Sequence, residues 1–283
     1  MVIWLFAGGG PPEYSGLVKL LQKEFPKYHF ERQLPQLAHK PIGKPNRIVP
    51  IVRSTTGSDL LRAISERLSF LLTRKSLEER LLKNSLCDAI LVIDDLDCRR
   101  WEGLVCNDIK SPGFHQIQNN YIQQVTRSLI QAKEPLDERM KNRLDELEFN
   151  PQIIVGFASP EIESWIIIAD WGNCHHRDFP QDQWDRMRRW LGHKDRAQAQ
   201  VDFKNPELYG GFNAQKGVCQ VKRSEQIVEA STQAQISEGV PQLSRYNKAR
   251  HSSDLLEKIS CQKVQEICPL FKTMYQSLQR LGT

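Results

Sequence analysis

Short apolar segments of strand length alternate along the first half of the chain with longer segments whose apolar residues recur at helical spacing. Uninterrupted apolar runs are typical of strands covered on both faces, and the helical repeats are typical of amphipathic helices. The expected strands are Val2–Ala7, Tyr28–Gln33, Ile48–Val52, Ala89–Ile93 and Gln152–Ala158. The expected helices are Glu13–Glu24, Ser58–Lys83 and Gln118–Leu147, and the basic stretch Lys40–Arg47 is expected to be a loop. The alternation predicts an α/β domain over residues 1–172 with a mainly parallel sheet flanked by helices.

The second part of the chain shows no convincing strand pattern from Glu161 onward. Helical spacing recurs near Ser164–Trp171, Gln183–Leu191, Ser253–Glu266 and Pro269–Leu281, with a polar stretch over Asp202–Arg250. We therefore expect residues 173–283 to form a helical C-terminal region that packs on the α/β domain.

Composition narrows the class of protein. The chain has 283 residues, of which 40% are hydrophobic and 26% charged, as in ordinary globular proteins. Its seven cysteines form no C-x-x-C pair, which favours reduced thiols, and no apolar stretch approaches the roughly 20 residues of a membrane span. We expect a soluble, cytoplasmic protein with no membrane partner. The net charge of +5 is compatible with a nucleic-acid partner.

Acidic residues follow three of the expected strands. In open α/β sheets, ligands bind beyond the carboxyl ends of the strands. The acids at that end are Glu13 after the first strand, Asp94, Asp95 and Asp97 after Ile93, and Glu161 and Glu163 after Ala158. Two carboxylates about 4 Å apart repel by roughly 4 kcal/mol at an effective dielectric constant near 20, so such a cluster needs protons or a cation. Carboxylates and water are the ligands that Mg²⁺ prefers, and Mn²⁺ accepts the same oxygen ligands, so we expect Mg²⁺ or Mn²⁺ here.

Strand alternation ranks the three aspartates. It sends Asp95 and Asp97 to one side and Asp94 to the other, so the first two are the leading metal ligands and Asp94 a lesser one. The alternative is that these aspartates begin a turn and cap a helix. Likewise, Glu161 and Glu163 could be first-turn acids stabilised by a helix dipole.

The order of these features resembles the Toprim domain of topoisomerases, primases and related nucleases. The segment Ala158–Asp170 is similar to the P-E-I-E-A-W-L-L-A-D signature of the bacterial Toprim-like family known as domain of unknown function 4276. Further similarities are Asn205-Pro206-Glu207, Tyr246-Asn247-Lys248 and Cys268-Pro269-Leu270-Phe271, so the resemblance spans nearly the whole chain. The resemblance implies that Asp95 and Asp97 hold the metal and that Glu163 joins them or orients a ligand.

The turn after the first strand departs from that family. Its members carry V-E-G-x-T-E there, whereas this chain has Gly8-Gly9-Gly10-Pro11-Pro12-Glu13. A glycine stands in place of the first Glu, which is the catalytic acid by resemblance. Glu13 matches the second Glu and is the remaining candidate for general acid or base.

Basic residues provide candidates for nucleic-acid contact. Arg188, Arg189 and Lys194 flank Trp184 and Trp190, a pattern that could follow a phosphate backbone and stack on bases. The alternative is a solvated helix face with its tryptophans in the core. Lys248 belongs to a segment shared with the family and could reach a substrate phosphate, and Lys44, Arg47 and Arg53 are weaker candidates.

These features lead us to expect a magnesium-dependent nuclease, and the resemblance places it in bacterial defence against viruses and mobile elements. One alternative is a non-catalytic binding or regulatory subunit that works with an ATPase or a larger effector complex. Another is a nucleotide-handling enzyme that uses the glycine turn Gly8–Gly10 to bind phosphate.

Overall fold

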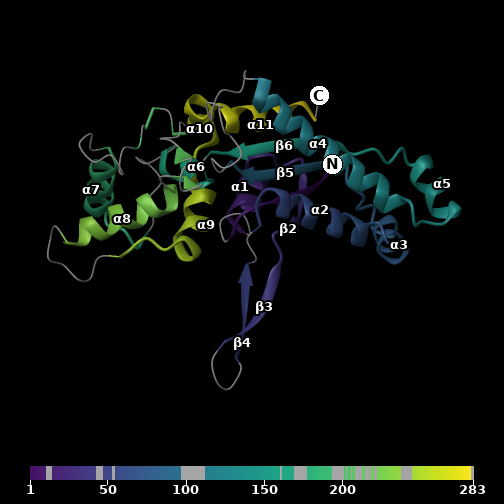
Figure 1. Ribbon diagram of the computed structural model, residues 1–283, viewed down its shortest axis with the longest axis horizontal. Coiled ribbons are helices and arrows are strands. Elements are labelled where there is room, and N and C mark those ends of the chain that lie inside the picture. The colour runs from purple at the N-terminus through teal and green to yellow at the C-terminus, as the bar shows by residue number, and fades with distance from the viewer. Residues whose placement is uncertain are drawn as a thin grey trace.

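A computed structural model gives the fold, and a sheet of four parallel strands lies at its centre (Figure 1). The strand order is β2 (His29–Leu34), β1 (Val2–Ala7), β5 (Ala89–Asp95) and β6 (Gln152–Ala158). The prediction of a parallel α/β sheet is confirmed. The structure describes residues 1–10, 15–42, 47–52, 55–96, 112–159, 161–168, 177–192, 201, 203–204, 206–207, 212–213, 218–219, 222–236 and 244–281.

Helices cover both faces of the sheet, because alternate residues of each strand point to opposite sides. On one face, Trp4, Phe6 and Val92 pack against residues of the helices between β4 (Arg47–Val52) and β6. These helices are α2 (Ser58–Leu71), α3 (Arg74–Leu82), α4 (Pro112–Lys133) and α5 (Glu138–Glu146).

The other face carries Ile3, Leu5 and Leu91, which share a core cluster with the first helix and the C-terminal helices. These helices are α1 (Leu17–Glu24), α6 (Glu163–Ile168), α7 (Gln181–Leu191), α8 (Arg223–Ile236), α9 (Lys248–Lys258), α10 (Cys261–Ile267) and α11 (Pro269–Arg280). The helical C-terminal part therefore shares one core with the sheet. Among the described residues, this core contains side chains from both sides of position 172.

Two long helices expected from periodicity are each interrupted. Helix Ser58–Lys83 breaks at Thr73, which has an extended ψ of 149°, and Leu71 and Leu77 on either side of the break both reach the core. The segment Gln118–Leu147 divides after Lys133, where Pro135 cannot continue a helix and Asp137 caps α5 by accepting from the Met140 amide. Apolar spacing alone does not register such breaks.

Three short strands and one helix lie where none was expected. Residues Lys40–Ile42 belong to β3 (Leu37–Ile42), which pairs antiparallel with β4 (Arg47–Val52), so the loop prediction is wrong there. The polar stretch Asp202–Arg250 contains α8 and a small pair, β7 (Phe212–Asn213) and β8 (Val218–Cys219).

The expected segment Ser253–Glu266 is two helices, α9 and α10, with Ser260 as the cap of the second. None of the helices in the described residues has the length and apolar character needed to cross a membrane.

Candidate functional site

The carboxyl ends of β1, β5 and β6 meet at one edge of the sheet. The amide of Gly8 donates to the carbonyl of Ile93 at 2.7 Å, and the amide of Leu96 donates to the carbonyl of Ala158 at 2.7 Å. The parallel register therefore brings the acids that follow Ile93 beside those that follow Ala158.

Asp94 lies on the side of the sheet that carries α2 and α4. Its Oδ2 accepts from the Gly57 amide at 2.8 Å and from the Tyr121 hydroxyl at 2.5 Å, and its Oδ1 accepts from the Asp95 amide at 2.9 Å. The residue is only 1% exposed. Asp94 thus ties the beginning of α2 and the middle of α4 to the end of β5, a structural role that already engages both carboxylate oxygens.

Asp95 is half-buried, and its carboxylate contacts the opposite side of the sheet. Its Oδ1 accepts from the Ile162 amide at 3.0 Å, just before α6 begins. Alternation thus separates Asp94 from Asp95, as expected from the strand period. Asp97 and Glu13 lie outside the described residues.

Glu163 is completely buried in the first turn of α6 and forms an ion pair with Lys248, the first residue of α9. The Nζ of Lys248 lies 2.7 Å from Oε1 of Glu163, and the Lys248 side chain remains 31% exposed. Oε2 of Glu163 has no hydrogen-bond partner among the described residues. Burial raises the pKa of Glu163, the ammonium of Lys248 opposes this, and the nearby Glu161 adds to it.

Glu161 contacts a different helix from Glu163. Its Oε2 accepts from the amide of Ser224 at 3.0 Å and from the Ser224 hydroxyl at 2.9 Å, near the beginning of α8. The two glutamates of the Pro-Glu-Ile-Glu segment therefore connect α6 to two different C-terminal helices.

Glu207 is a buried acid that belongs to the segment Asn205-Pro206-Glu207 but that we did not count among the candidate site residues. Its carboxylate accepts from the indole Nε1 of Trp165 at 3.1 Å and from the amides of Leu270 at 2.8 Å and Phe271 at 3.3 Å. Burial raises the pKa of Glu207 to about 7, against the opposing effect of these donors. The carboxylate thereby satisfies the first free amides of α11.

The four segments that we compared with the Toprim-like pattern lie together around α6. Glu163 contacts Lys248, and Trp165 contacts both Glu207 and Phe271, whose ring lies 4.8 Å from the indole ring. The only signal for these pairings in the sequence was the joint resemblance of the segments, because they are far apart along the chain.

The basic candidates fall in separate places. Arg188 and Arg189 are exposed on α7, and the guanidinium of Arg188 lies 5.3 Å from the centre of the Phe203 ring. Trp184 is 1% exposed, so it cannot stack on a base. Lys194 lies outside the described residues, and of these basic candidates Lys248 is the one that the described structure brings to the acids.

A hard cation such as Mg²⁺ requires oxygen ligands, and two side chains at this edge of the sheet can supply them. Asp95 and Glu163 offer carboxylate oxygens near the start of α6, and the buried Oε2 of Glu163 suits a cation ligand. Within the described part of the chain, no group of three or more His, Cys, Asp or Glu side chains could hold a metal ion. A site built on Asp95 and Glu163 would therefore need Asp97, Glu13, water or a substrate phosphate to complete it.

These features define a three-layer α/β protein with a parallel sheet and with acids and one lysine at its carboxyl edge. Comparison of the chain with protein-family models, with curated proteins and with solved structures finds no match in any of the three.

Proposed function

We propose that the protein is a nuclease that depends on Mg²⁺ or Mn²⁺ and acts at the carboxyl edge of the sheet. The observation that carries the proposal is Glu163, a fully buried carboxylate beside the segment capped by Asp95 and paired with the partly exposed Lys248. Transfer of both charges of an ion pair from water costs several kcal/mol per ion, so such a pair is a weak source of stability. Carboxylates with a perturbed pKa at the ligand-binding edge of a sheet are typical of functional sites.

Each residue has a distinct part in this proposal. Asp95, Asp97 and Glu163 would hold the cation, which when bound polarises the phosphorus and stabilises the leaving oxygen. Lys248 would bind a phosphate oxygen from its position at the start of α9. Glu13 would serve as general acid or base. The resemblance to Toprim-like proteins supports this assignment and a role in bacterial defence.

A catalytically inactive binding or regulatory subunit is the second candidate, favoured by the turn after β1. A Cβ at Gly8 would lie 2.6 Å from Oδ1 of Asp94 and 2.8 Å from the carbonyl oxygen of Thr55, and Gly9 has a φ of 93°. Neither position accepts a side chain without rearrangement. The first Glu of the Toprim-like pattern therefore has no place in this turn, and the acidic edge could serve binding within a complex that includes an ATPase or effector.

Incubation of the purified protein with single- and double-stranded DNA and RNA, in Mg²⁺, Mn²⁺ or chelator, tests the two candidates. Cleavage that chelator abolishes supports the nuclease, binding without cleavage supports the second candidate, and turnover of free nucleotides alone supports neither.

Site variants sharpen this experiment. Asp95→Asn keeps an oxygen for the Ile162 amide, and Glu163→Gln keeps the shape of the buried side chain. Both variants should lose cleavage, while Glu266→Gln, at an exposed position on α10, should retain it. Cleavage at the unmodified rate in both site variants would exclude this site as the catalytic centre.

A further inference from the structure

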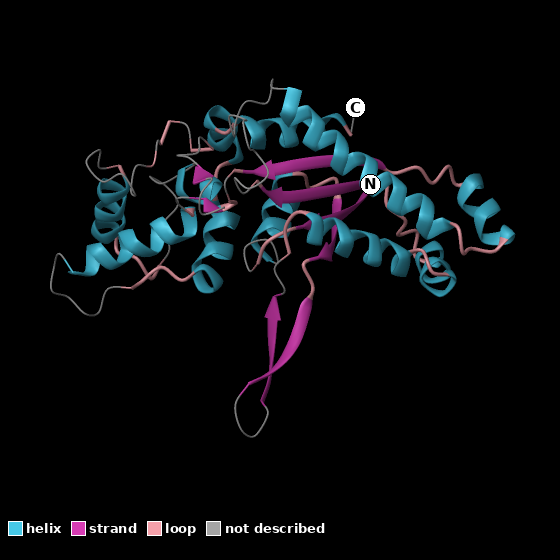
Figure 2. Ribbon diagram, in the orientation of Figure 1, coloured by secondary structure: helices cyan, strands magenta, loops and turns pink. Residues whose placement is uncertain are grey.

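Strands β3 and β4 form an arm that extends away from the body of the protein (Figure 1, Figure 2). Their antiparallel register runs from Leu37 opposite Val52 to Ile42 opposite Arg47. Among the described strands, β3 and β4 pair with each other and not with the central sheet. The arm is thus a slender two-stranded ribbon that the central sheet does not extend.

The charge of this part of the chain is entirely of one sign. From Arg32 to Ser58 the sequence contains no Asp or Glu, although the whole chain has 34 acids against 39 basic residues. The basic residues of this stretch are Arg32, Lys40, Lys44, Arg47 and Arg53. Lys40 lies in β3 and Arg47 is the first residue of β4, so both belong to the half of the ribbon that is farther from the body, and Lys44 stands between them in the sequence.

Prolines disfavour the extension of the ribbon by a strand from a protein partner. Pro41 lies in β3 and Pro50 in β4, and neither has an amide hydrogen to donate. Proline on an edge strand is one of the devices that prevent edge-to-edge pairing. This leaves insertion of the whole ribbon into a groove as the mode of contact that the backbone suits.

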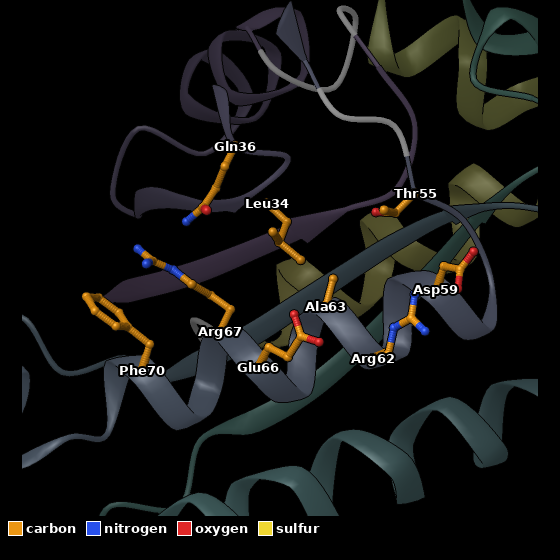
Figure 3. Close-up of a pocket in the computed structure, with 9 residues that line it drawn as sticks. All are labelled: Leu34, Gln36, Thr55, Asp59, Arg62, Ala63, Glu66, Arg67 and Phe70. Carbon is orange, nitrogen blue, oxygen red and sulfur yellow. Dashed lines mark hydrogen bonds and ion pairs between the residues drawn. The ribbon is translucent and has the colours of Figure 1, made fainter. Parts of the chain in front are cut away.

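The hollow at the root of the arm does not explain the positive charge of the arm. It has a volume of about 840 Å³ and lies between the end of β2, the root of the arm and α2 (Figure 3). Its lining balances Arg62 and Arg67 against Asp59 and Glu66. Arg62 lies 3.0 Å from Asp59, and Arg67 donates to Gln33, so neither cation of the hollow stands without a partner.

We propose that the arm binds in a groove of a double-stranded nucleic acid, with its basic residues on the phosphates. The major groove of B-form DNA, about 12 Å wide, admits a two-stranded β-ribbon. A ribbon without acids meets no like-charge repulsion from the polyanion. This inference rests on the proposed function, for which it names the substrate class as a duplex, but binding by the arm requires no catalytic step.

Binding in chelator, measured by fluorescence anisotropy with a labelled DNA duplex and with one of its single strands, tests the arm separately from cleavage. The arm variant is Lys40→Ser/Lys44→Ser/Arg47→Ser. The matched control removes three cations from exposed positions on or next to α3 and α5, as Lys75→Ser/Lys83→Ser/Arg139→Ser. We expect the arm variant to bind duplex roughly tenfold more weakly, with the control unchanged. The negative slope of the logarithm of the association constant against the logarithm of the salt concentration should become smaller in magnitude by about 2 to 3 in the arm variant.

Several results would overturn the proposal. The first is no duplex binding by the unmodified protein. The second is a duplex affinity of the arm variant equal to that of the unmodified protein. The third is a loss of single-strand affinity in the arm variant as large as its loss of duplex affinity. A change of oligomeric state with duplex binding intact, after replacement of residues 38–51 by a short Gly-Ser linker, would instead make the arm a protein contact. Arm-dependent duplex binding without cleavage in Mg²⁺ would refute the nuclease alone, and cleavage with arm-independent binding would refute the arm alone.

Discussion

The Nζ of Lys248 lies 2.7 Å from Oε1 of Glu163, and this contact joins the start of α9 to a carboxylate with no exposed surface. The pair stands at the carboxyl edge of the sheet, beside the Ile162 amide that Asp95 caps. It connects the helical C-terminal part to the acids that follow the strands.

Lys248→Met should lower the free energy of unfolding by about 3 kcal/mol at neutral pH, because the buried Glu163 loses its ammonium partner and must either stay charged or take up a proton. The double variant Lys248→Met/Glu163→Gln should recover much of this loss. Urea denaturation at pH 7 measures both.

The exposed pair of Lys19 and Glu257 is the matched control, with a similar distance of 2.8 Å. Lys19→Met should change the free energy of unfolding by less than about 1 kcal/mol, since exposed ion pairs contribute little. Equal effects of the two lysine substitutions would contradict the importance of burial.

Asp94→Ala should destabilise the fold by roughly 3 kcal/mol, because it leaves the Gly57 amide and the Tyr121 hydroxyl without their buried acceptor. Asp95→Asn should have a much smaller effect, since it keeps an acceptor for Ile162. Thermal unfolding of the two variants makes the comparison. A melting temperature for Asp94→Ala equal to that of the unmodified protein would show that these hydrogen bonds do not stabilise the edge of the sheet.

Gly8→Ala should destabilise the protein by about 1 to 3 kcal/mol, because the added Cβ meets the Asp94 carboxylate at 2.6 Å and backbone at 2.8 Å. Gly10→Ala is the control, since a Cβ there would lie more than 4 Å from every atom of the described residues other than its chain neighbours. Chemical denaturation of both variants measures the difference. A Gly8→Ala protein as stable as the Gly10→Ala protein would mean that the turn after β1 can accept a side chain.

Glu207 should make stability depend on pH in an unusual direction. Burial raises its pKa from 4.5 to about 7, so between these values the folded protein keeps a proton that the unfolded chain releases. The free energy of unfolding should therefore fall as pH rises from about 4.5 to about 7, and then level off.

Glu207→Gln, which resembles the protonated acid, isolates this effect. Urea midpoints of both proteins at several pH values from 5 to 8 should show the stability of the unmodified protein declining relative to the variant across that window. A constant difference between the two proteins would mean that Glu207 does not titrate there.

The periodicity of apolar residues was sufficient to predict the four strands of the central sheet, their parallel arrangement and most of the helices. It also placed Asp94 and Asp95 at a strand end and on opposite sides, because strand alternation is a local property of the backbone. It did not predict the breaks at Thr73 and after Lys133, since the helices on both sides of each break contribute to one apolar pattern.

Only the tertiary structure decided what each acid contacts. Asp94 accepts from Tyr121, Glu163 pairs with Lys248, and Glu207 accepts the amides that begin α11. The partners in each case lie far apart in sequence, and packing of helices on the two faces of the sheet brings them together. A local pattern reports which side of an element a residue occupies, whereas the partner found there depends on the fold of the whole chain.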